Sequence, residues 1–438
     1  MPGHRQSDRR AVLRLAVPAF LALVAEPLFL LADSAIVGHL GTASLAGLGI
    51  ASAGLVTAAN VFVFLAYGTT AVVARRTGAG DTRGAVAAGI DGVWLAVLLG
   101  TATGVAVAVA AEPIGRVLGA SAGVLDQATT YLRISAAGVP GMLVVLAATG
   151  VLRGLQDTRT PLVAAVLGFG ANIGLNLFLV YGLRLGIAGS ALGTVLAQSV
   201  MAAGLFAVVA RKARWLGAPL RPHSAGVLTA AVGGIPLLVR TLALRAVLLL
   251  TTWAAAGLGD VPLAAYQVSA TVWSFLAFAL DALASAAQAL TGHALGGNDV
   301  ATARSATSLM VRWGVGAGVV LGVLLLLVHR LLPPLFTGDP AVQAALAAGL
   351  VVVAIGQPLS GYVFVLDGVL IGAGDGRWLA GAQTVVLAAY LPMVAWAREF
   401  ATSLPQLWLA FTGFMAVRAV ALGWRARGDG WLVTGTLS

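Results

Sequence analysis

Long apolar stretches, separated by short clusters of charged residues, Gly and Pro, follow one another along the whole chain. A helix needs about 20 apolar residues to cross a bilayer, since each residue advances it by about 1.5 Å. The pattern therefore predicts an all-α membrane protein with about twelve transmembrane helices. Their expected spans are residues 12–39, 44–74, 85–111, 123–152, 160–182, 187–211, 226–257, 262–292, 303–331, 341–371, 378–397 and 405–425.

The chain also repeats itself, with a second copy following the first at a constant offset of 218 residues. The identical pairs include Pro18 and Pro236, Gly41 and Gly259, Asp81 and Asp299, Pro140 and Pro358, Gly154 and Gly372, and Asp157 and Asp375. One offset serves them with no gap between Pro18 and Arg159. We predict an N-lobe of residues 1–215 and a C-lobe of residues 216–438, with six helices each. An even number of helices makes the repeat parallel, as in transporters whose site lies between two halves.

Composition supports a lipid environment. The chain is 59% hydrophobic and 10% charged, with a mean hydropathy of +0.96. So few charges could not solubilise a globular protein of this length. The 56 glycines suit helices that pack closely through small residues. The N-terminal apolar run lacks a signal-peptide cleavage site and continues to Ile36, so we expect an uncleaved first helix.

The net charge of +10 reflects topology rather than a surface for nucleic acid. If the N-terminus is cytoplasmic, the loops on the other side hold only Arg116, Arg184, Arg330 and Arg398. Most other basic residues, including the linker RKARWLGAPLRPH at 211–223, then lie inside. The positive-inside rule thus predicts a multi-pass protein of the bacterial inner membrane with both termini in the cytoplasm.

Several kinds of chemistry are excluded. The chain has no cysteine, so thiol catalysis and Cys-bound metals are absent. Its single lysine, Lys212, does not follow a P-loop glycine pattern, so we expect no ATP hydrolysis. No paired histidines or nucleophile elbow indicate an enzyme. We expect no cofactor and no resident metal, and any pumping must draw on an ion gradient.

Ten charged residues fall at membrane depth or near helix ends. They are Glu26, Asp33, Asp91, Asp281, Asp367, Arg133, Arg240, Arg245, Arg312 and Arg418. A charged group there is costly, so each should face a cavity, find a partner or become neutral. Burial favours the neutral form of a carboxyl, which lets such a group bind and release a proton.

Asp33 is the strongest candidate for such a proton site. Glu26 lies seven residues earlier, about two turns along the same helical face. Pro18 and Pro27 precede Asp33, and an internal proline removes a backbone hydrogen bond, so this helix can bend. The competing interpretations are that Asp33 marks a helix end near the outer interface and that Glu26 has a structural partner.

Amides and arginines complete the set of candidates. Asn172 and Asn176 are four residues apart and share a helical face, where they could bind a carboxyl or a cation or join two helices. In the C-lobe, Arg240, Arg245, Asp281, Asp367 and Gln288 predict a polar network, because a buried arginine needs an anion. Trp273, Tyr266, Phe62 and Tyr362 could line a drug cavity, although core packing or lipid contact is the simpler interpretation.

Three segments resemble the multidrug and toxic compound extrusion (MATE) family, and within it the DinF-like branch. They are PLFLLADSAIVGHLG, YLRISAAGVP with VLRGLQDTRTPL, and FLAFALDALASAAQALTGHALG. The resemblance covers essentially the whole chain. It implies two six-helix lobes around a central cavity, alternating access, and export of cationic or amphipathic compounds in exchange for protons or sodium.

The resemblance also implies roles for single residues. Asp33 matches the family's first-helix aspartate, Pro18 its bending proline, and Asn172 a cavity asparagine. Asp281 and Asp367 match acids of the DinF-like second lobe. Asn176 stands where relatives often have aspartate, and Gln288 where an acid is common. The missing acid at 176 weakens sodium binding, so proton coupling is favoured, with a sodium ion near Asp33 and Asn172 as the alternative.

The sequence therefore predicts a monomeric antiporter in the lipid bilayer that exchanges small amphipathic or cationic compounds for protons or sodium. A flippase for lipid-linked precursors, which shares the superfamily architecture, is the first alternative. It would need a cavity lined by several cations, whereas the candidates here are mostly acids and amides. A membrane-embedded enzyme is the second alternative, disfavoured by the absence of a catalytic motif.

Overall fold

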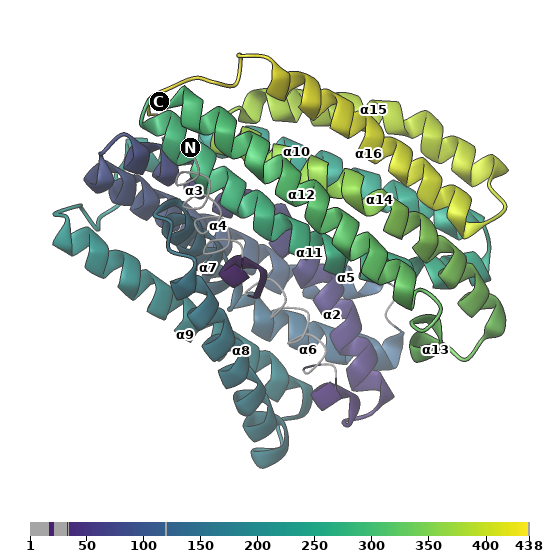
Figure 1. The fold of residues 1–438 in the computed structure, drawn as a ribbon. Helices are drawn as coiled ribbons and strands as arrows, with labels where there is room; N and C mark the ends of the chain where they lie inside the picture. Colours follow the sequence, from purple (N-terminus) through teal and green to yellow (C-terminus); the bar gives the residue numbers. More distant parts are fainter. Residues whose placement is uncertain (1–16, 22–32, 34, 119–120, 437–438) are drawn as a thin grey trace. The chain divides into compact units, whose positions relative to one another are not determined.

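The structure is a computed structural model, and it describes residues 17–21, 33, 35–118 and 121–436. Every regular element in this part of the chain is a helix (Figure 1). The first copy of the repeat forms α2 (Thr42–Val61), α3 (Phe64–Gly78), α4 (Thr82–Val109), α5 (Ala111–Val117), α6 (Ala122–Ala136), α7 (Val139–Gly154), α8 (Arg159–Leu177), the π-helical turn η1 (Phe178–Gly182) and α9 (Gly186–Trp215).

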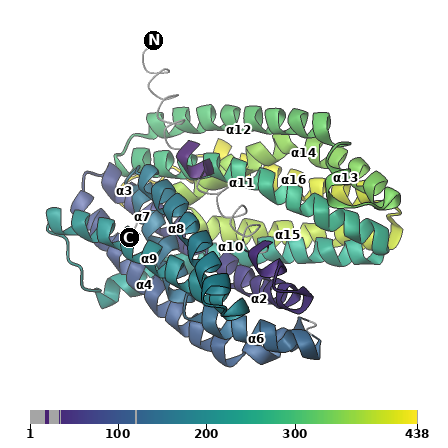
Figure 2. The same ribbon diagram turned by 90° about the horizontal axis from the view of Figure 1, so that it is seen from below.

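The second copy forms longer, uninterrupted helices. They are α10 (Ser224–Gly257), α11 (Asp260–Gly296), α12 (Val300–Val328), the short α13 (Pro333–Phe336), α14 (Pro340–Gly372), α15 (Gly376–Phe400) and α16 (Leu404–Arg427). Within this copy α14 contacts α11, α12 and α16, and these helices lie side by side in both views (Figures 1 and 2).

Membrane-length helices dominate the described residues. Nine are long and apolar enough to cross a bilayer, or ten when α6 and α7, bent by 50° at their junction, count as one span. These helices agree with the predicted spans, and α2 with α3 covers the predicted span 44–74. The predicted first helix, 12–39, lies largely outside the described residues. The short helices α5 and α13, each following a long helix, were not predicted.

Glycine contacts show that the two copies pack in the same way. A Cβ atom at Gly100 would meet Pro140 Cα at 2.6 Å, and one at Gly318 would meet Pro358 Cα at 2.7 Å. Gly104 faces the Ala136 carbonyl as Gly322 faces that of Ala354. Every one of these pairs differs by 218 residues, so the repeat extends from the sequence to helix–helix contacts. Small residues allow these backbones to approach closely.

Turns between the helices repeat in the same register. Gly41 and Gly259 both have positive φ angles, 118° and 101°. Gln156 and Gly374 also correspond, with φ angles of 60° and 75°. This left-handed conformation suits glycine and strains a residue with a Cβ atom, so Gln156 stores strain that its counterpart avoids.

Continuity distinguishes the copies. The first is interrupted between α2 and α3, bends between α6 and α7, and ends α8 in a π-helical turn, whereas α11 and α14 run through the corresponding positions. Local sequence does not decide this. Gly138 and Pro140 adjoin the bend, yet the equivalent Gly356 and Pro358 lie inside the continuous α14. The packing around α14, which three helices cover, therefore overrides the proline there.

Residue contacts divide the chain into two compact units. The N-unit contains Leu21–Ile235, and the C-unit contains Pro236–Gly435 with the described residues up to Phe20. The division falls within α10, and the predicted lobe boundary at residues 215 and 216 stays a prediction. The preceding linker is fixed to α4, because Trp94 Nε1 donates to the Leu220 carbonyl at 3.1 Å and Asp91 Oδ1 accepts from His223 N at 2.9 Å.

Candidate functional site

Asp33 lies buried in the N-unit, 3% exposed, inside a cage of uncharged hydrogen-bond donors. Asn176 Nδ2 and Ser190 Oγ each donate to Asp33 Oδ1 at 2.7 Å. Tyr131 OH donates to Asp33 Oδ2 at 3.4 Å. Within the described residues Asp33 forms no ion pair with a basic side chain. We call Asp33 with Tyr131, Asn172, Asn176, Ser190 and Thr194 the N-cage.

Two antiparallel helices carry most of the N-cage. Asn172 and Asn176 are one turn apart on α8, and Ser190 and Thr194 are one turn apart on α9, so two polar stripes face each other. Asn172 Nδ2 donates to Thr194 Oγ1 at 3.3 Å, one turn from the Asn176–Asp33 contact. The glycine between the α9 hydroxyls, Gly193, fits so closely that a Cβ atom there would overlap Asn176 Oδ1.

A π-helical turn follows the α8 stripe directly. Tyr181, on η1, donates from its hydroxyl to the Ile36 carbonyl at 2.6 Å, one turn beyond Asp33. Such turns are frequent at functional sites because they depart from regular α-helical hydrogen bonding. Apolar residues including Val37, Leu132 and Ala191 pack around Tyr131 and exclude water from that side. The N-cage is therefore a polar cluster within apolar packing.

Some buried oxygens of the N-cage lack a partner. Asn172 Oδ1 and Asn176 Oδ1 accept no hydrogen bond from any group the structure contains, and Gln198 Oε1, one turn beyond Thr194, is in the same situation. Buried polar atoms are usually satisfied by protein or water, so these oxygens could accept from water or coordinate a cation. No group of three or more His, Cys, Asp or Glu occurs in the described part of the chain, so Asp33 is the sole carboxyl of the N-cage.

Asp367 is the buried carboxylate of the C-unit, and its surroundings are cationic. Arg240 contacts it through Nε, at 3.1 Å from Oδ1, and through Nη2. Arg418 Nη2 lies 3.0 Å from Asp367 Oδ2. All three residues are at most 6% exposed. They tie α10, α14 and α16 together by charge-assisted hydrogen bonds, which are among the strongest available to side chains.

Comparison with known proteins identifies the family. A family model described as MatE matches residues 18–178 and again residues 236–394, and the two matches begin 218 residues apart. Protein DETOXIFICATION 44, chloroplastic, from Arabidopsis thaliana is 31% identical over 94% of this chain and 81% of its own length. DNA damage-inducible protein F from Escherichia coli (strain K12) is 29% identical over 96% of this chain and 92% of its own length.

The chain belongs to the MATE family, on its DinF-like branch. A solved structure described as MATE in the bent conformation superimposes with a TM-score of 0.87 at 22% identity, covering 96% of this chain and 95% of that one. This likeness confirms the fold predicted from the repeat. MATE proteins are transporters, so the chain is a multi-pass membrane protein of a multidrug transporter family.

The structure of this MATE transporter brings several predicted site residues together. Asp33, Asn172 and Asn176 meet in the N-cage, and Arg240 with Asp367 forms the centre of the C-unit network. Arg245 and Asp281 are half-buried on α10 and α11, and Gln288 is buried on α11. Pro18 lies in a helical stretch at residues 17–21. Glu26 and Pro27 lie outside the described residues.

Three N-cage residues of this MATE transporter escaped the sequence interpretation. Tyr131, Ser190 and Thr194 were not singled out, because hydroxyl side chains are common in apolar helices and often donate to their own backbone. A usable signal was nonetheless present: Ser190 and Thr194 repeat the spacing of Asn172 and Asn176 on the next helix. Two polar pairs at i, i+4 on neighbouring antiparallel helices predict a shared polar face.

Proposed function

We propose that this MATE transporter exports small amphipathic, cationic compounds in exchange for protons, and that Asp33 carries the coupling proton. The supporting observation is the neutral character of the N-cage. An ionised Asp33 has three hydrogen-bond donors and no paired cation among the described residues. A proton or a cationic substrate can each supply the missing positive charge.

Competition for one buried charge provides the basis for exchange. A ligand shifts a conformational equilibrium only by its differential affinity for the two states. Ionised Asp33 attracts a cation, and protonated Asp33 does not, so proton uptake releases the substrate. The π-helical turn after α8 and the interruptions at α2–α3 and α6–α7 supply backbone that can adjust around the N-cage.

The C-unit carboxylate is unsuited to the same task. Asp367 already contacts two guanidinium groups, which hold it ionised and leave a bound cation little to gain. We therefore assign the C-unit network a structural role. A flippase for lipid-linked phosphates would need these arginines for its anion, but both contact Asp367. We further propose a monomer in a bacterial inner membrane with both termini in the cytoplasm, as the arginine distribution predicts.

Sodium is the alternative coupling ion. The N-cage offers the Asp33 carboxylate, the carbonyl oxygens of Asn172 and Asn176, and two hydroxyls, which are oxygen ligands of the kind that hard cations prefer. Only one of these groups is anionic, and two donors occupy one of its oxygens. Protonation needs no such ligand set, and we favour it for this reason.

Efflux from proteoliposomes tests the proposal. The purified transporter is reconstituted with a permanently cationic aromatic dye inside, and a proton gradient and a sodium gradient are imposed separately. We expect the proton gradient to drive efflux by wild type and by Asp339→Asn, an exposed helix-cap control. Asp33→Asn should fall to the level of empty liposomes. Full efflux by Asp33→Asn would refute the role of Asp33, and efflux driven by sodium alone would refute proton coupling.

A further inference from the structure

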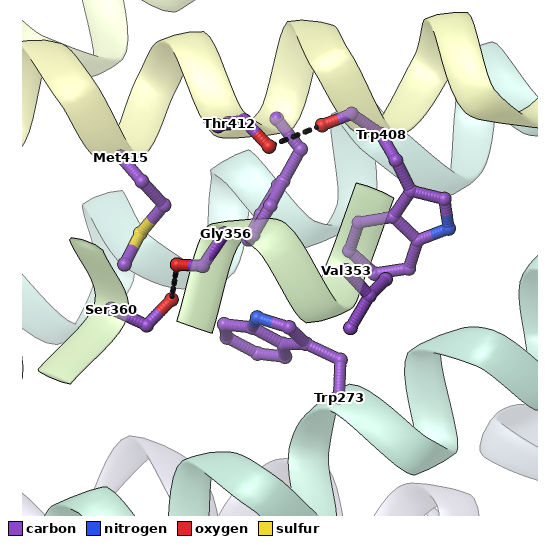
Figure 3. A pocket seen from close by; sticks show the side chains of 8 residues that line it. Trp273, Val353, Gly356, Ser360, Trp408, Thr412 and Met415 are labelled. Carbon is purple, nitrogen blue, oxygen red and sulfur yellow. Dashed lines mark hydrogen bonds between the residues drawn. The ribbon is translucent and has the colours of Figure 1, made fainter. Parts of the chain in front are cut away.

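A hollow in the C-unit lies where the repeat places the counterpart of the N-cage. Its lining comes from α11, α14 and α16 and consists of Trp273, Val353, Gly356, Ser360, Trp408, Phe411, Thr412 and Met415 (Figure 3). At the offset of 218, Ser190 corresponds to Trp408, Gly193 to Phe411, and Thr194 to Thr412. Polar N-cage positions on α9 thus become aromatic positions on α16.

The rest of the N-cage is also replaced by uncharged groups. Asp33 corresponds to Thr251 and Asn172 to Tyr390, and these two hydroxyls lie 2.8 Å apart in a buried hydrogen bond. Tyr390 packs against Phe414, which packs against Phe411 of the hollow, with 5.5 Å between ring centroids in each case. The duplicated position has therefore exchanged an ionisable cage for an aromatic one.

The ring geometry of the hollow favours a flat ligand. Phe411 meets Trp273 at 84° with centroids 5.1 Å apart, and it meets Trp408 at 82° with centroids 5.4 Å apart. Perpendicular walls form a corner in which a planar ring can stack on one wall while the other presents its edge, the arrangements that aromatic pairs prefer. A saturated ring of the same size cannot gain both contacts.

Polar atoms of the hollow are engaged within the protein. Ser360 Oγ donates to the Gly356 carbonyl at 3.1 Å, and Thr412 Oγ1 donates to the Trp408 carbonyl at 2.8 Å, as the dashed lines show (Figure 3). Trp408 Nε1 donates to Ser269 Oγ at 3.0 Å. No charged side chain belongs to the lining. The hollow therefore suits an uncharged group, since a charge would lose its hydration without compensation.

Size and access limit the ligand further. The empty space is about 230 Å³ including its open mouth, less than the roughly 300–1,000 Å³ of a pocket for a whole drug-sized molecule. Val353, Trp408, Phe411 and Met415 form a buried base, and Trp273, Gly356 and Thr412 are half-buried around it. The side chains are packed in place, so binding costs little ordering of the protein.

We propose that this hollow is a binding subsite for the neutral, planar aromatic portion of an amphipathic ligand, about one fused ring pair in size. Its role as a substrate subsite rests on the export function proposed above, whereas the binding itself does not. The two copies of the repeat would then divide recognition, with charge sensed at the N-cage and flat aromatic surface at its C-unit counterpart.

Photolabelling with two matched neutral probes tests the subsite. One probe joins a diazirine to naphthalene, and the other joins the same diazirine to decalin, its saturated and non-planar analogue. Both are applied to the full chain in detergent without a gradient, and labelled peptides are mapped by mass spectrometry. We expect the naphthyl probe to label α11 and α16 at the hollow roughly five- to tenfold more than the decalin probe, as stacking on two walls predicts.

A glycine pair supplies the variants. A Cβ atom at Gly356 would meet only Thr412 Oγ1, at 3.6 Å, so Gly356→Leu can fold while its side chain fills the mouth. Gly316, on α12 of the same unit, has nothing within 4 Å of its Cβ position, so Gly316→Leu is the matched control. Gly356→Leu should abolish the naphthyl preference, and Gly316→Leu should keep it. Equal labelling by both probes, or labelling unchanged in Gly356→Leu, would overturn the proposal.

The same measurement separates this subsite from the export mechanism. Asp33→Asn should label like wild type, because the hollow lies wholly within the C-unit. If labelling follows the expected pattern while Asp33→Asn still exports, the coupling mechanism fails and the subsite stands. If Asp33→Asn abolishes export but the naphthyl probe shows no preference, the subsite fails and the coupling mechanism stands.

Discussion

In the N-unit a buried aspartate is held by three neutral donors, whereas in the C-unit a buried aspartate is held by two guanidinium groups. The helices around both positions pack through the same glycine contacts at the same offset. Backbone packing and buried charge have therefore diverged independently. A carboxyl among neutral donors can exist with or without its proton, but a carboxyl between two arginines must stay ionised to balance them.

Helix continuity follows the same division. The copy that carries Asp33 has interrupted and bent helices and a π-helical turn, and the copy that carries Asp367 has continuous ones. An ion network across α10, α14 and α16 suits a unit that keeps its shape. A neutral cage beside irregular backbone suits a unit that responds to a proton. The substitutions below test this contrast.

The largest expected effect is on stability and separates the two aspartates. Asp367→Asn leaves Arg240 and Arg418 buried without their carboxylate, and breaking a buried ion pair costs roughly 3–5 kcal/mol. Asp33→Asn removes a charge that no described cation balances and keeps an acceptor for Asn176 and Ser190, so its cost should stay below about 1.5 kcal/mol. Thermal unfolding of both variants in the same detergent measures the difference. Equal loss in the two variants would contradict the contrast.

An intermediate effect comes from crowding the N-cage. Gly193→Ala places a Cβ atom against Asn176 Oδ1 and should push that amide away from Asp33. Overpacking of this kind costs about 1–3 kcal/mol, and proton-driven efflux should fall more than stability does. Gly204→Ala is the control on the same helix, since nothing lies within 4 Å of its Cβ position. Unchanged efflux in Gly193→Ala would show that the Asn176–Asp33 contact is dispensable for transport.

The sequence predicted the helices and the charged half of the site. Long apolar spans, the offset of 218 and the isolated Asp33 are visible in one dimension, because a charge in an apolar run stands out. The pairing of Asn172 and Asn176 on one face followed from helical periodicity. Asp367 with Arg240 followed from the need of a buried arginine for an anion, and the structure adds Arg418 to that pair.

What the sequence did not reveal depends on tertiary packing. Gly138 and Pro140 adjoin a bend while the equivalent Gly356 and Pro358 do not, so only the surrounding helices decide. Tyr131 joins the N-cage from a distant part of the chain, and no local pattern identifies it. Trp273 was interpreted as core packing or lipid contact, but it lines the C-unit hollow, whereas Tyr266 is buried in the core at 4% exposed.

The smallest expected effect compares two equivalent helix caps. Asp81 Oδ1 accepts from Gly84 N at 2.8 Å at the start of α4. Asp299 accepts from Thr302 N at 2.8 Å and also from the Thr302 hydroxyl at 2.6 Å at the start of α12. The Thr302 side-chain and backbone hydrogen bonds lower the pKa of Asp299 from its ordinary value of 3.8. The ionised cap therefore stabilises the folded state above that value, and this contribution is lost as the pH falls through the lower, folded pKa.

Asp299→Ala should therefore lower the thermal midpoint slightly at neutral pH, by less than either substitution above. The difference from wild type should shrink as the pH falls below 3.8, because the cap is then protonated in both the folded and the unfolded chain. Asp299→Asn is the control, since asparagine caps a helix without titrating. It should retain most of the midpoint at neutral pH, and its midpoint relative to Asp299→Ala should not change with pH. If the gap between wild type and Asp299→Ala stayed constant to low pH, the hydroxyl of Thr302 would give the second copy no charge-dependent advantage over the cap at Asp81.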